Sequence, residues 1–551
     1  MLAKLLQLVA LAGVASTVLA EAHTAPSLAL KDIGNGVHVP GAIPMRDTEP
    51  LQHRLAYSGS DGMTVSWSTF AHIKEPTVWY GESPSQLDMK ARSCDSRTFQ
   101  SSRTWNNHVK ISGLKPNTKY YYRVAGTNQP GSAYLPTYSF VTARAAGDEK
   151  PLTIATFGDL GLMGQDGLST KTGPIGGDNF TELGQYETNT IQSLLMNKDS
   201  YDFMYHVGDI GYADYFVKES VQGYFGLNNT MPTHEQVADG YESLSEQFFD
   251  QMTPITAEKP WMVLAGNHEA NCVNGGVFEK HENWTVASCV PGQQNFTWYR
   301  NHYAMPTDEA GAVENMWYSF ENGPVHFVSL LTEVDLGANL TGPIEKAKHA
   351  SHGPVVNGPF GAPNQQIDWL KRDLASIDRK KTPWVVAAMH RPYYTSVQIP
   401  DDYPVWQQAF EDILYEHDVD MVLHGHVHTE EIFAPMYNGT IDPNGLSNPR
   451  APLYIVQGAA GHYDGLDHYE SDARLNGSIY SNDQAYGWGK LTFHNRTHAT
   501  YDYVASRNSS VIHSETLYKE HAYDCKDGKK DEKKKEHGKG KKVNARASIS
   551  L

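Results

Sequence analysis

Five short polar blocks, each placed shortly after a predicted strand, constrain this chain more than any other feature of its sequence. Each block contains Asp, Asn or His, and each strand is a run of apolar or β-branched residues. In chain order they are Asp159 after Leu152–Phe157, Asp209 after Phe203–Val207, Asn267 and His268 after Trp261–Ala265, His390 after Trp384–Met389, and His424, His426 and His428 after Met421–Leu423. Because the carboxyl ends of strands in α/β sheets converge on a crevice, the pattern predicts one shared site.

Each block taken alone also has an ordinary structural interpretation. A Gly-Asp pair is typical of a turn, an Asn-His pair of a loop, and His424–His428 of a surface histidine cluster. Five blocks at five strand ends favour the shared site over five unrelated loops.

The chain divides into two regions with different periodicity. Residues 48–145 alternate short β-type runs with turns, among them Met63–Thr69 and Lys119–Val124, which predicts a β-sandwich. Residues 150–525 alternate strands with helical stretches, which predicts an α/β domain. Further strands are expected at Val325–Leu331 and Leu453–Val456, and helices at Leu183–Asn197, Gln365–Ile377 and Val405–His417.

The charge balance limits the possible partners. The net charge is −18, and Lys and Arg outnumber Asp and Glu in residues 526–551, so the rest of the chain is more acidic still. An acidic surface repels nucleic-acid phosphates, which excludes a general DNA or RNA binder. A phosphorylated substrate requires a local positive centre.

The first residues resemble a targeting segment. Residues 1–20 combine Lys4, an apolar run from Leu5 to Leu19 and a small residue at Ala20, which predicts a cleaved secretion signal followed by an N-terminal extension over residues 21–47. A signal anchor is the alternative, but the run is shorter than the roughly 20 residues of a membrane helix. No other segment is apolar enough to span a bilayer, so we expect a secreted protein, with the cell wall as the alternative location.

Secretion changes the interpretation of the sequons and cysteines. Nine Asn-x-Ser/Thr sites suggest a glycoprotein: Asn179, Asn228, Asn283, Asn295, Asn339, Asn438, Asn476, Asn495 and Asn508. Of the possible disulfides, Cys272 with Cys289 closes a short loop and is preferred, while Cys94 and Cys525 form a long-range bridge or stay separate. The Lys-rich tail, residues 526–551, has almost nothing to bury and is expected to be disordered, a polyanion tether being the alternative.

Two family resemblances follow from these motifs. Gly113–Tyr122 resembles the tyrosine corner of fibronectin type III domains, in which a tyrosine hydroxyl bonds to the local backbone. The blocks Gly158-Asp-Leu-Gly161, Gly208-Asp-Ile-Gly-Tyr212, Gly266-Asn-His-Glu269, Val386–His390 and Gly425-His-Val-His428 resemble the five ordered motifs of the metallophosphoesterase superfamily, in the form found in purple acid phosphatases of the larger plant and fungal type.

The resemblance implies an α/β domain with two mixed β-sheets flanked by helices, and a dinuclear metal centre in it. Its expected ligands are Asp159, Tyr212 and His428 for Fe(III), Asn267, His390 and His426 for a divalent ion (Zn, Fe or Mn), and Asp209 as the bridge. Carboxylates and a phenolate form a hard anionic set suited to Fe(III), whereas imidazoles and an amide suit a divalent ion. Two metals about 3.5–4 Å apart can position a phosphate and supply a hydroxide for in-line attack. His268 is expected to hydrogen-bond the phosphoryl oxygens or the departing alkoxide.

This chain departs from the family pattern at two places. Ala387 stands where the motif usually has Val, and Ile399 with Pro400 stand where plant relatives have two histidines. Asp401, Asp402 and His268 therefore become the candidates for the proton donor.

We therefore expect a secreted acid phosphatase that hydrolyses phosphate monoesters. A phosphodiesterase, nucleotide pyrophosphatase or phytase could use the same dimetal core, because the choice depends on pocket walls that sequence spacing does not reveal. A catalytically silent cell-wall glycoprotein is the alternative from another class, and the complete set of seven ligands argues against it.

Overall fold

The structure, a computed structural model, describes residues 47–125, 135–163, 183–215, 233–269, 290–307, 312–333, 364–397, 403–461, 465–470 and 473–521. Several sequence predictions lie outside these ranges. They are the signal segment 1–20, most of the extension 21–47, the Cys272–Cys289 pair, Cys525, the sequons at Asn179, Asn228, Asn283 and Asn339, Asp401 and Asp402, and the tail 526–551.

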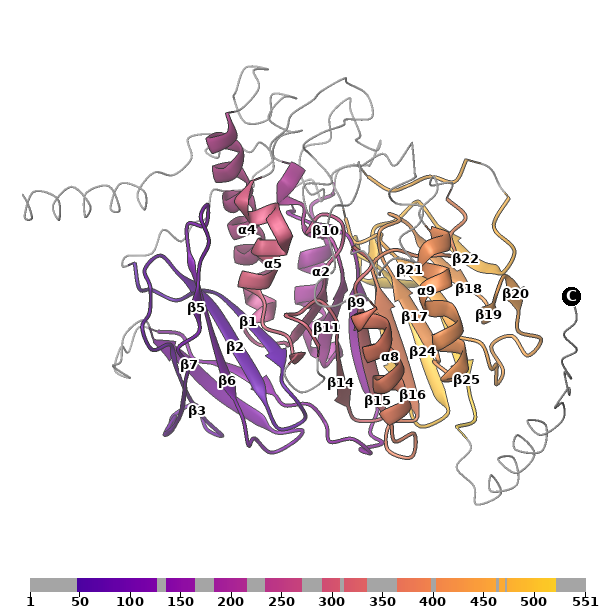
Figure 1. The fold of residues 1–551 in the computed structure, drawn as a ribbon, viewed down its shortest axis with the longest axis horizontal. Coiled ribbons are helices and arrows are strands. Elements are labelled where there is room, and N and C mark those ends of the chain that lie inside the picture. Colours follow the sequence, from indigo (N-terminus) through magenta and orange to yellow (C-terminus); the bar gives the residue numbers. More distant parts are fainter. Residues whose placement is uncertain are drawn as a thin grey trace, which may run out of the picture.

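The N-terminal region is a β-sandwich, as predicted (Figure 1). Its two antiparallel sheets each have four strands. One has the order β1 (Leu51–Tyr57), β2 (Met63–Thr69), β6 (Trp105–Ile111), β5 (Ser96–Arg97); the other has the order β4 (Met89–Arg92), β3 (Thr77–Gly81), β7 (Lys119–Ala125), β8 (Tyr138–Val141).

The tyrosine corner is also confirmed. The Tyr120 hydroxyl accepts a hydrogen bond of 3.1 Å from the backbone N–H of Lys115. Tyr120 is 3% exposed, and its ring stacks on Phe140 of the neighbouring strand with ring centroids 6.0 Å apart. The corner therefore ties the turn before β7 to the core of the sandwich.

The second region contains the two mixed sheets predicted from the sequence. The first sheet has the order β13 (Trp261–Leu264), β11 (Phe203–Val207), β9 (Leu152–Phe157), β23 (Gly487–Phe493), β24 (His498–Ala505), β25 (Ser510–Tyr518). The second has the order β14 (Tyr318–Asn322), β15 (Val325–Leu330), β16 (Trp384–Met389), β17 (Met421–His424), β21 (Leu453–Gln457), β18 (Glu430–Phe433), β22 (Ser478–Asn482). Two short pairs complete the strands: β10 (Leu160–Gly161) with β12 (Ile210–Gly211), and β19 (Met436–Tyr437) with β20 (Thr440–Ile441).

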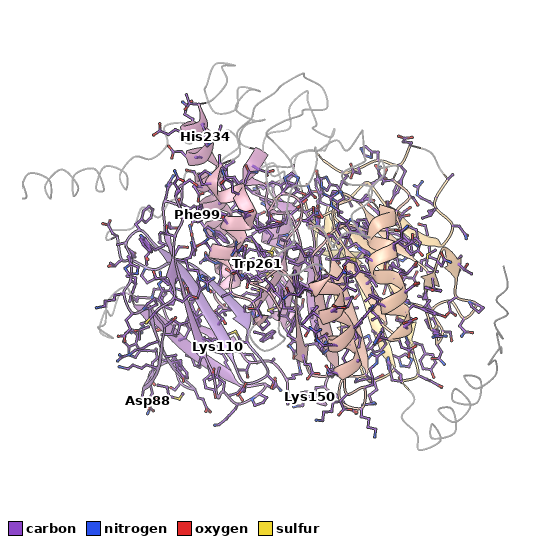
Figure 2. The ribbon with its side chains drawn as sticks, viewed as in Figure 1. Asp88, Phe99, Lys110, Lys150, His234 and Trp261 are labelled. Atoms are coloured by element: carbon purple, nitrogen blue, oxygen red, sulfur yellow. The ribbon has the colours of Figure 1, made fainter. Side chains whose placement is uncertain are left out.

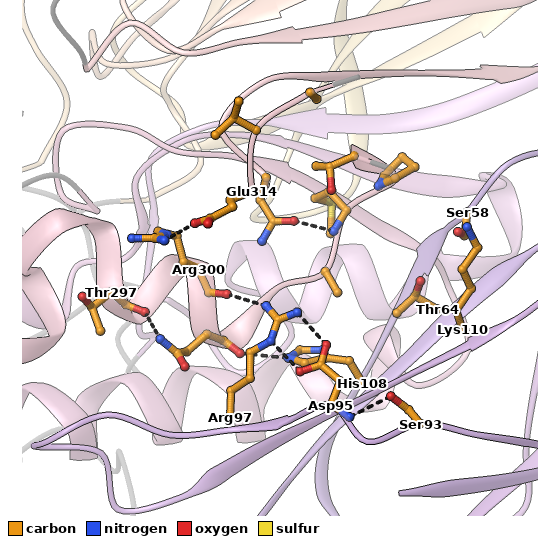
Figure 3. Close-up of a pocket in the computed structure, with 18 residues that line it drawn as sticks. Ser58, Thr64, Ser93, Asp95, Arg97, His108, Lys110, Thr297, Arg300 and Glu314 are labelled. Atoms are coloured by element: carbon orange, nitrogen blue, oxygen red, sulfur yellow. Dashed lines mark hydrogen bonds and ion pairs between the residues drawn. The ribbon is translucent and has the colours of Figure 1, made fainter. Parts of the chain in front are cut away.

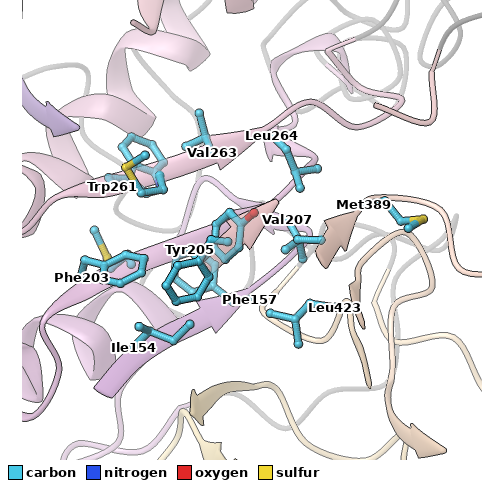
Figure 4. Packing of buried hydrophobic residues seen from close by; sticks show 14 of the residues in the cluster. Ile154, Phe157, Phe203, Tyr205, Val207, Trp261, Val263, Leu264, Met389 and Leu423 are labelled. Carbon is cyan, nitrogen blue, oxygen red and sulfur yellow. The ribbon is translucent and has the colours of Figure 1, made fainter. Parts of the chain in front are cut away.

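The two sheets pack face to face through aromatic and aliphatic side chains. Phe203 on β11 meets Phe327 on β15 with ring centroids 5.4 Å apart, and the Tyr205 hydroxyl lies 2.6 Å from Ser329 Oγ. Figure 4 shows this apolar layer, including Met389 and Leu423 from the second sheet. Strands buried on both faces require continuous apolar runs, which explains why these strands were recognisable in the sequence.

Helices cover the outer faces. They are α2 (Thr190–Met196), α4 (His234–Thr256), α5 (Thr297–His302), α8 (Gln365–Ser376) and α9 (Tyr403–Glu416), with short 3-10 helices η2 (Lys198–Ser200), η3 (Ala213–Tyr215) and η4 (Pro291–Phe296). Figure 1 places α8 and α9 over the second sheet, and α4 with α5 between the sandwich and the first sheet. His234 marks the outer end of α4 in Figure 2.

One helix prediction was too long, and two α-helices, α4 and α5, were not predicted. The helix predicted at Leu183–Asn197 begins only at Thr190, because Asn189 caps its first turn. The Asn189 side chain accepts a hydrogen bond of 2.9 Å from the backbone N–H of Gln192, and the Gln192 side chain accepts one of 3.0 Å from the backbone N–H of Asn189. Helix α4 was not predicted, although it has 23 residues.

A buried charge cluster joins the end of β25 to the second sheet. The Asp420 carboxylate, which is 0% exposed, pairs with Lys519 at 2.7 Å, Arg379 at 3.2 Å and His521 at 3.2 Å, and accepts from the Val385 N–H at 2.7 Å. Burial would raise the pKa of Asp420, but Lys519, Arg379 and His521 outweigh burial and hold it far below its usual value. The carboxylate therefore stays ionised in acid.

We expect Asp420→Asn to lower the free energy of unfolding by about 3–5 kcal/mol, because it leaves buried cations without their counter-charge. A carboxyl whose pKa is depressed in the folded protein contributes stability above its ordinary pKa of about 4. The loss should therefore be the same at about pH 5 and about pH 7.5, as measured by urea unfolding. A loss that disappears at about pH 5 would contradict this assignment.

The surface agrees with several expectations that remain predictions. Within the described ranges, the sequon asparagines Asn295, Asn438, Asn476, Asn495 and Asn508 are all exposed, as glycan attachment requires. Cys94 is exposed as well. None of the helices in the described ranges is both long and apolar enough to cross a membrane.

Candidate metal centre

The predicted site residues from both sheets meet at one edge of the α/β domain. Asp159, Asp209 and Asn267 follow three parallel strands of the first sheet, whereas His390, His426 and His428 follow two parallel strands of the second. A bridge between Leu160 and Gly461 joins the loops of the two sheets beside the site. The expected convergence of strand ends is therefore present.

One group of donors surrounds the Tyr212 hydroxyl. That oxygen lies 2.9 Å from Asp159 Oδ1, 3.1 Å from Asp209 Oδ2 and 3.1 Å from His428 Nε2. His428 Nε2 is also 3.4 Å from Asp159 Oδ1. Two carboxylates, a phenol and an imidazole thus point at one position.

A second group surrounds the side-chain oxygen of Asn267. Asn267 Oδ1 lies 2.9 Å from His390 Nε2 and 2.7 Å from His426 Nδ1. Asp209 Oδ2, which already contacts Tyr212, is 3.1 Å from His390 Nε2. Asp209 is therefore the residue that both groups share.

The local backbone is shaped to aim these side chains. Asp159, Asp209, Tyr212 and His426 all have positive φ, from 51° to 70°. Left-handed backbone is uncommon for residues with a Cβ and clusters at functional sites. Close packing explains why glycine precedes both Asp209 and Asn267. A Cβ at Gly208 would lie 2.4 Å from His390 Nδ1, and one at Gly266 would lie 2.2 Å from Asp209 Oδ1.

Contacts on the far side of two imidazoles involve the main chain and an arginine. His390 Nδ1 lies 2.9 Å from the carbonyl oxygen of Val207, which leaves Nε2 to face the donor group. His426 Nε2 lies 3.3 Å from Arg391 Nη1. The Arg391 guanidinium also donates two hydrogen bonds, of 2.8 and 2.9 Å, to the carboxylate of Glu333. Sequence reasoning missed Arg391 and Glu333, although Arg391 directly follows a ligand candidate in the chain.

Electrostatics favour a cation at this position. Burial would raise the pKa of Asp209, but His390 and His268 hold it well below its usual value. Burial would lower the pKa of His390, but Asp209 and Asp159 outweigh burial and raise it to about 10. Donor atoms of Asp209, His390 and His426 also lie within 4.8 Å of one another, a spacing that fits a metal ion. The carboxylate, phenol, imidazole and amide donors are therefore suited to metal binding.

His268 lies beside the donor groups and is held by the carboxylate of Asp214. Its Nδ1 lies 2.8 Å from Asp214 Oδ2, and its Nε2 is 3.8 Å from Asp209 Oδ2. Burial would lower the pKa of His268, but Asp214 and Asp209 outweigh burial and raise it to about 9. Asp214 was missed from the sequence, where the only signal was an acidic residue two positions after Tyr212.

Glu269, whose role was unclear from the sequence, holds the loop of the shared carboxylate. Its Oε2 accepts from the backbone N–H groups of Asp209 at 2.9 Å and Gly266 at 2.8 Å, and its Oε1 accepts from Ile210 at 2.7 Å. Glu269 is 3% exposed. These three bonds tie the loops after β11 and β13 together.

We expect Glu269→Gln to lower the free energy of unfolding by about 2–4 kcal/mol, because an amide NH₂ replaces one oxygen that accepts from backbone N–H groups. Urea unfolding measures the loss, and metal analysis should show reduced metal content. Glu235→Gln, an exposed position on α4, is the matched control. Unchanged stability would show that the loop does not depend on Glu269.

His424 does not join the site, although it belongs to the same polar block. It is 1% exposed and lies against Tyr393 and Tyr454 in the core, with ring centroids 5.4 and 6.2 Å away. Burial lowers its pKa to about 3. His424 is therefore a neutral core residue.

Comparisons with known proteins cover most of the chain. The family "Purple acid Phosphatase, N-terminal domain" matches residues 50–142, "Calcineurin-like phosphoesterase" matches residues 152–430, and "Iron/zinc purple acid phosphatase-like protein C" matches residues 451–514. Acid phosphatase A of Cryphonectria parasitica is 34% identical over 87% of this chain and 94% of its own length. Purple acid phosphatase 23 of Arabidopsis thaliana is 30% identical over 76% of this chain and 80% of its own length.

The fold is shared with a solved structure. Purple acid phosphatase PPD1 from yellow lupin (Lupinus luteus) seeds superposes with a TM-score of 0.63 at 21% identity, over 86% of this chain and 74% of that one. Together with the family matches, which span both domains, this likeness agrees with the two-domain architecture. The chain therefore belongs to the purple acid phosphatase family and is an enzyme of the calcineurin-like phosphoesterase type.

Proposed function

We propose that this protein is a secreted acid phosphatase that hydrolyses phosphate monoesters at a dinuclear centre of Fe(III) and a divalent ion. The proposal draws on membership of the family, on the names of the relatives as acid phosphatases, and on the sequence of residues 1–20. The site adds the chemical support, because its donors form two groups of different character that share one carboxylate.

The observation that carries the proposal is the position of the Tyr212 hydroxyl, within about 3 Å of Asp159, Asp209 and His428. A phenol has a pKa near ~10, so it ionises in acid only beside a strongly Lewis-acidic ion. We assign Asp159, Tyr212 and His428 to Fe(III), and Asn267, His390 and His426 to the divalent ion, with Asp209 as the bridge.

Two bound ions would supply Lewis acidity toward phosphate oxygens and lower the pKa of a water molecule. The protein supplies the rest of the chemistry. Asp209 holds the two donor groups together, and Glu269 fixes the loop that carries Asp209. His268, oriented by Asp214, would donate a proton to the leaving alkoxide or a hydrogen bond to the phosphoryl group.

The test of the proposal is Tyr212→Phe. The wild-type protein should be purple or pink, because a phenolate bound to Fe(III) gives a charge-transfer absorption band, and the variant should be colourless. Visible spectra with elemental analysis measure both colour and metal content, and Tyr215→Phe, three residues further along the chain, is the control. A colourless, iron-free wild-type enzyme with full activity on phosphate monoesters would refute the metal assignment.

A further inference from the structure

The contact between the N-terminal sandwich and the α/β domain has two parts with different charge pairing. One part lines a cavity of about 760 Å³ (Figure 3). Both carboxylates that line it form a salt bridge with an arginine. Arg97 donates two hydrogen bonds, of 2.5 and 2.6 Å, to Asp95, and Arg300 pairs with Glu314. Arg97 also donates to the carbonyl oxygen of Arg300 across the domain boundary at 3.0 Å.

The other part is the face of α4 that meets the sandwich. It holds more carboxyl groups than cations to pair with them. Glu242, Glu246 and Asp250 are spaced four residues apart, so they share one face of the helix. Glu242 and Glu246 are 2% and 4% exposed. Arg103 of the sandwich, 3.1 Å from Glu246, is the one cation that pairs with them in the described part of the chain.

The remaining neighbours of these carboxyls are uncharged or acidic. From the sandwich, Ser101 Oγ donates to Glu242 at 3.1 Å and Gln52 Nε2 lies 3.3 Å from Asp250 Oδ1. From η4, the backbone of Gly292 packs against Glu242. On α4 itself the titratable neighbours are Asp239 and Tyr241. The guanidinium of Arg54 on β1 binds Asn106 and stacks on the ring of Phe249 instead of pairing with these carboxyls.

We propose that this face of α4 is a pH-sensitive contact, which holds the N-terminal domain on the helix while the carboxyls are protonated and weakens when they ionise. The proposal rests on the domain contact alone, so its failure would leave the proposed function untouched.

The pH range follows from the carboxyl groups. Burial has the largest effect on Glu246 and raises its pKa to about 7, with Arg103 opposing the rise and the neighbouring carboxylate Asp250 adding to it. Burial raises the pKa of Asp250 to about 6, and burial with Glu246 raises that of Glu242 well above its usual value. Because the unfolded chain releases these protons at lower pH than the folded chain, the free energy of unfolding falls as the pH rises from about 4 to about 7.

The same helix also supports the site. The Gln251 side chain exchanges hydrogen bonds of 2.9 and 2.6 Å with the backbone of Met163, in the loop after Asp159. A Cβ at Gly211, next to Tyr212, would lie 3.2 Å from the Phe248 ring. A weaker contact along α4 would therefore also reduce the support of the two loops that carry Asp159 and Tyr212.

The experiment compares the full-length protein with Glu242→Gln at about pH 5 and about pH 7.5. The amide cannot ionise, so we expect the variant to exceed the wild-type Tm only slightly at about pH 5 and by roughly 3 °C more at about pH 7.5. Hydrogen exchange of residues 239–256, corrected for the intrinsic pH dependence, should show faster exchange at the higher pH in the wild type than in the variant.

Two further variants test the sign of the effect. Glu235→Gln, at the exposed start of α4, should change the Tm equally at both pH values. Arg103→Met removes the compensating cation, so its Tm loss should be larger at about pH 7.5 than at about pH 5. The proposal is overturned if the Tm difference between Glu242→Gln and wild type is the same at both pH values, or if Arg103→Met shows no dependence on pH.

Discussion

Asp209→Ala should reduce phosphatase activity more than substitution of any other proposed ligand, with a loss in kcat on the order of 10³-fold or more. Asp209 Oδ2 contacts both the Tyr212 hydroxyl at 3.1 Å and His390 Nε2 at 3.1 Å, so its removal takes a donor from both groups at once. Asp209 Oδ1 also accepts from the His268 N–H at 2.9 Å, so the loop after β13 loses a contact as well.

The comparison variants are Asp159→Ala and Asn267→Ala, each of which removes a donor from one group alone. Elemental analysis should find both metals depleted in Asp209→Ala and one metal preferentially depleted in each of the others. If Asp209→Ala retained two metals and near-normal turnover, its assignment as the bridge would have to be dropped.

His268→Ala should lose about 10²–10⁴-fold in kcat while keeping both metals and the colour, because His268 lies beside the donor groups without joining either. Its imidazole is bound to Asp214 at 2.8 Å, and the Tyr212 ring lies against it with centroids 4.2 Å apart. Asp214→Asn should cause a smaller loss of the same kind, because it keeps the imidazole but weakens the group that orients it.

Paired substrates identify what His268 does. If the variant hydrolyses an activated aryl phosphate far better than an alkyl phosphate, the lost step is protonation of the leaving group. Equal losses on both substrates indicate phosphate binding instead. Loss of the metals would make His268 a ligand or a structural residue, and unchanged rates would remove it from the mechanism.

The sequence predicted the seven parallel strands of the two mixed sheets and the donor clusters because both leave local signals, whereas the antiparallel strands β14, β18 and β22 to β25 were not predicted. Strands such as Trp384–Met389 are buried on both faces and therefore appear as unbroken apolar runs. The polar blocks then fall at strand ends, so topology alone brings Asp159 next to His428 across the two sheets.

The residues that support the site were missed because their roles depend on contacts between distant segments. Glu269 binds backbone groups about 60 positions away, and Arg391 reaches Glu333 at a similar separation. Helix α4 is a different case, since its signal was present. Thr233 and Gln236 form a capping box, and Val237, Tyr241, Leu244, Phe248, Met252 and Ile255 repeat with helical spacing on the buried face.

The division of the donors between the two sheets has a consequence for how the protein acquires its metals. Tyr212 comes from the first sheet and His428 from the second, and Asn267 and His426 are divided in the same way. Neither half of the α/β domain therefore holds a complete donor set, so an ion can be bound tightly only after the sheets have packed. Metal uptake would then report the completion of folding, and bound metal would stabilise the packed domain in proportion to its free concentration. Starving the cell of metal during synthesis should consequently reduce the amount of folded protein as well as its activity.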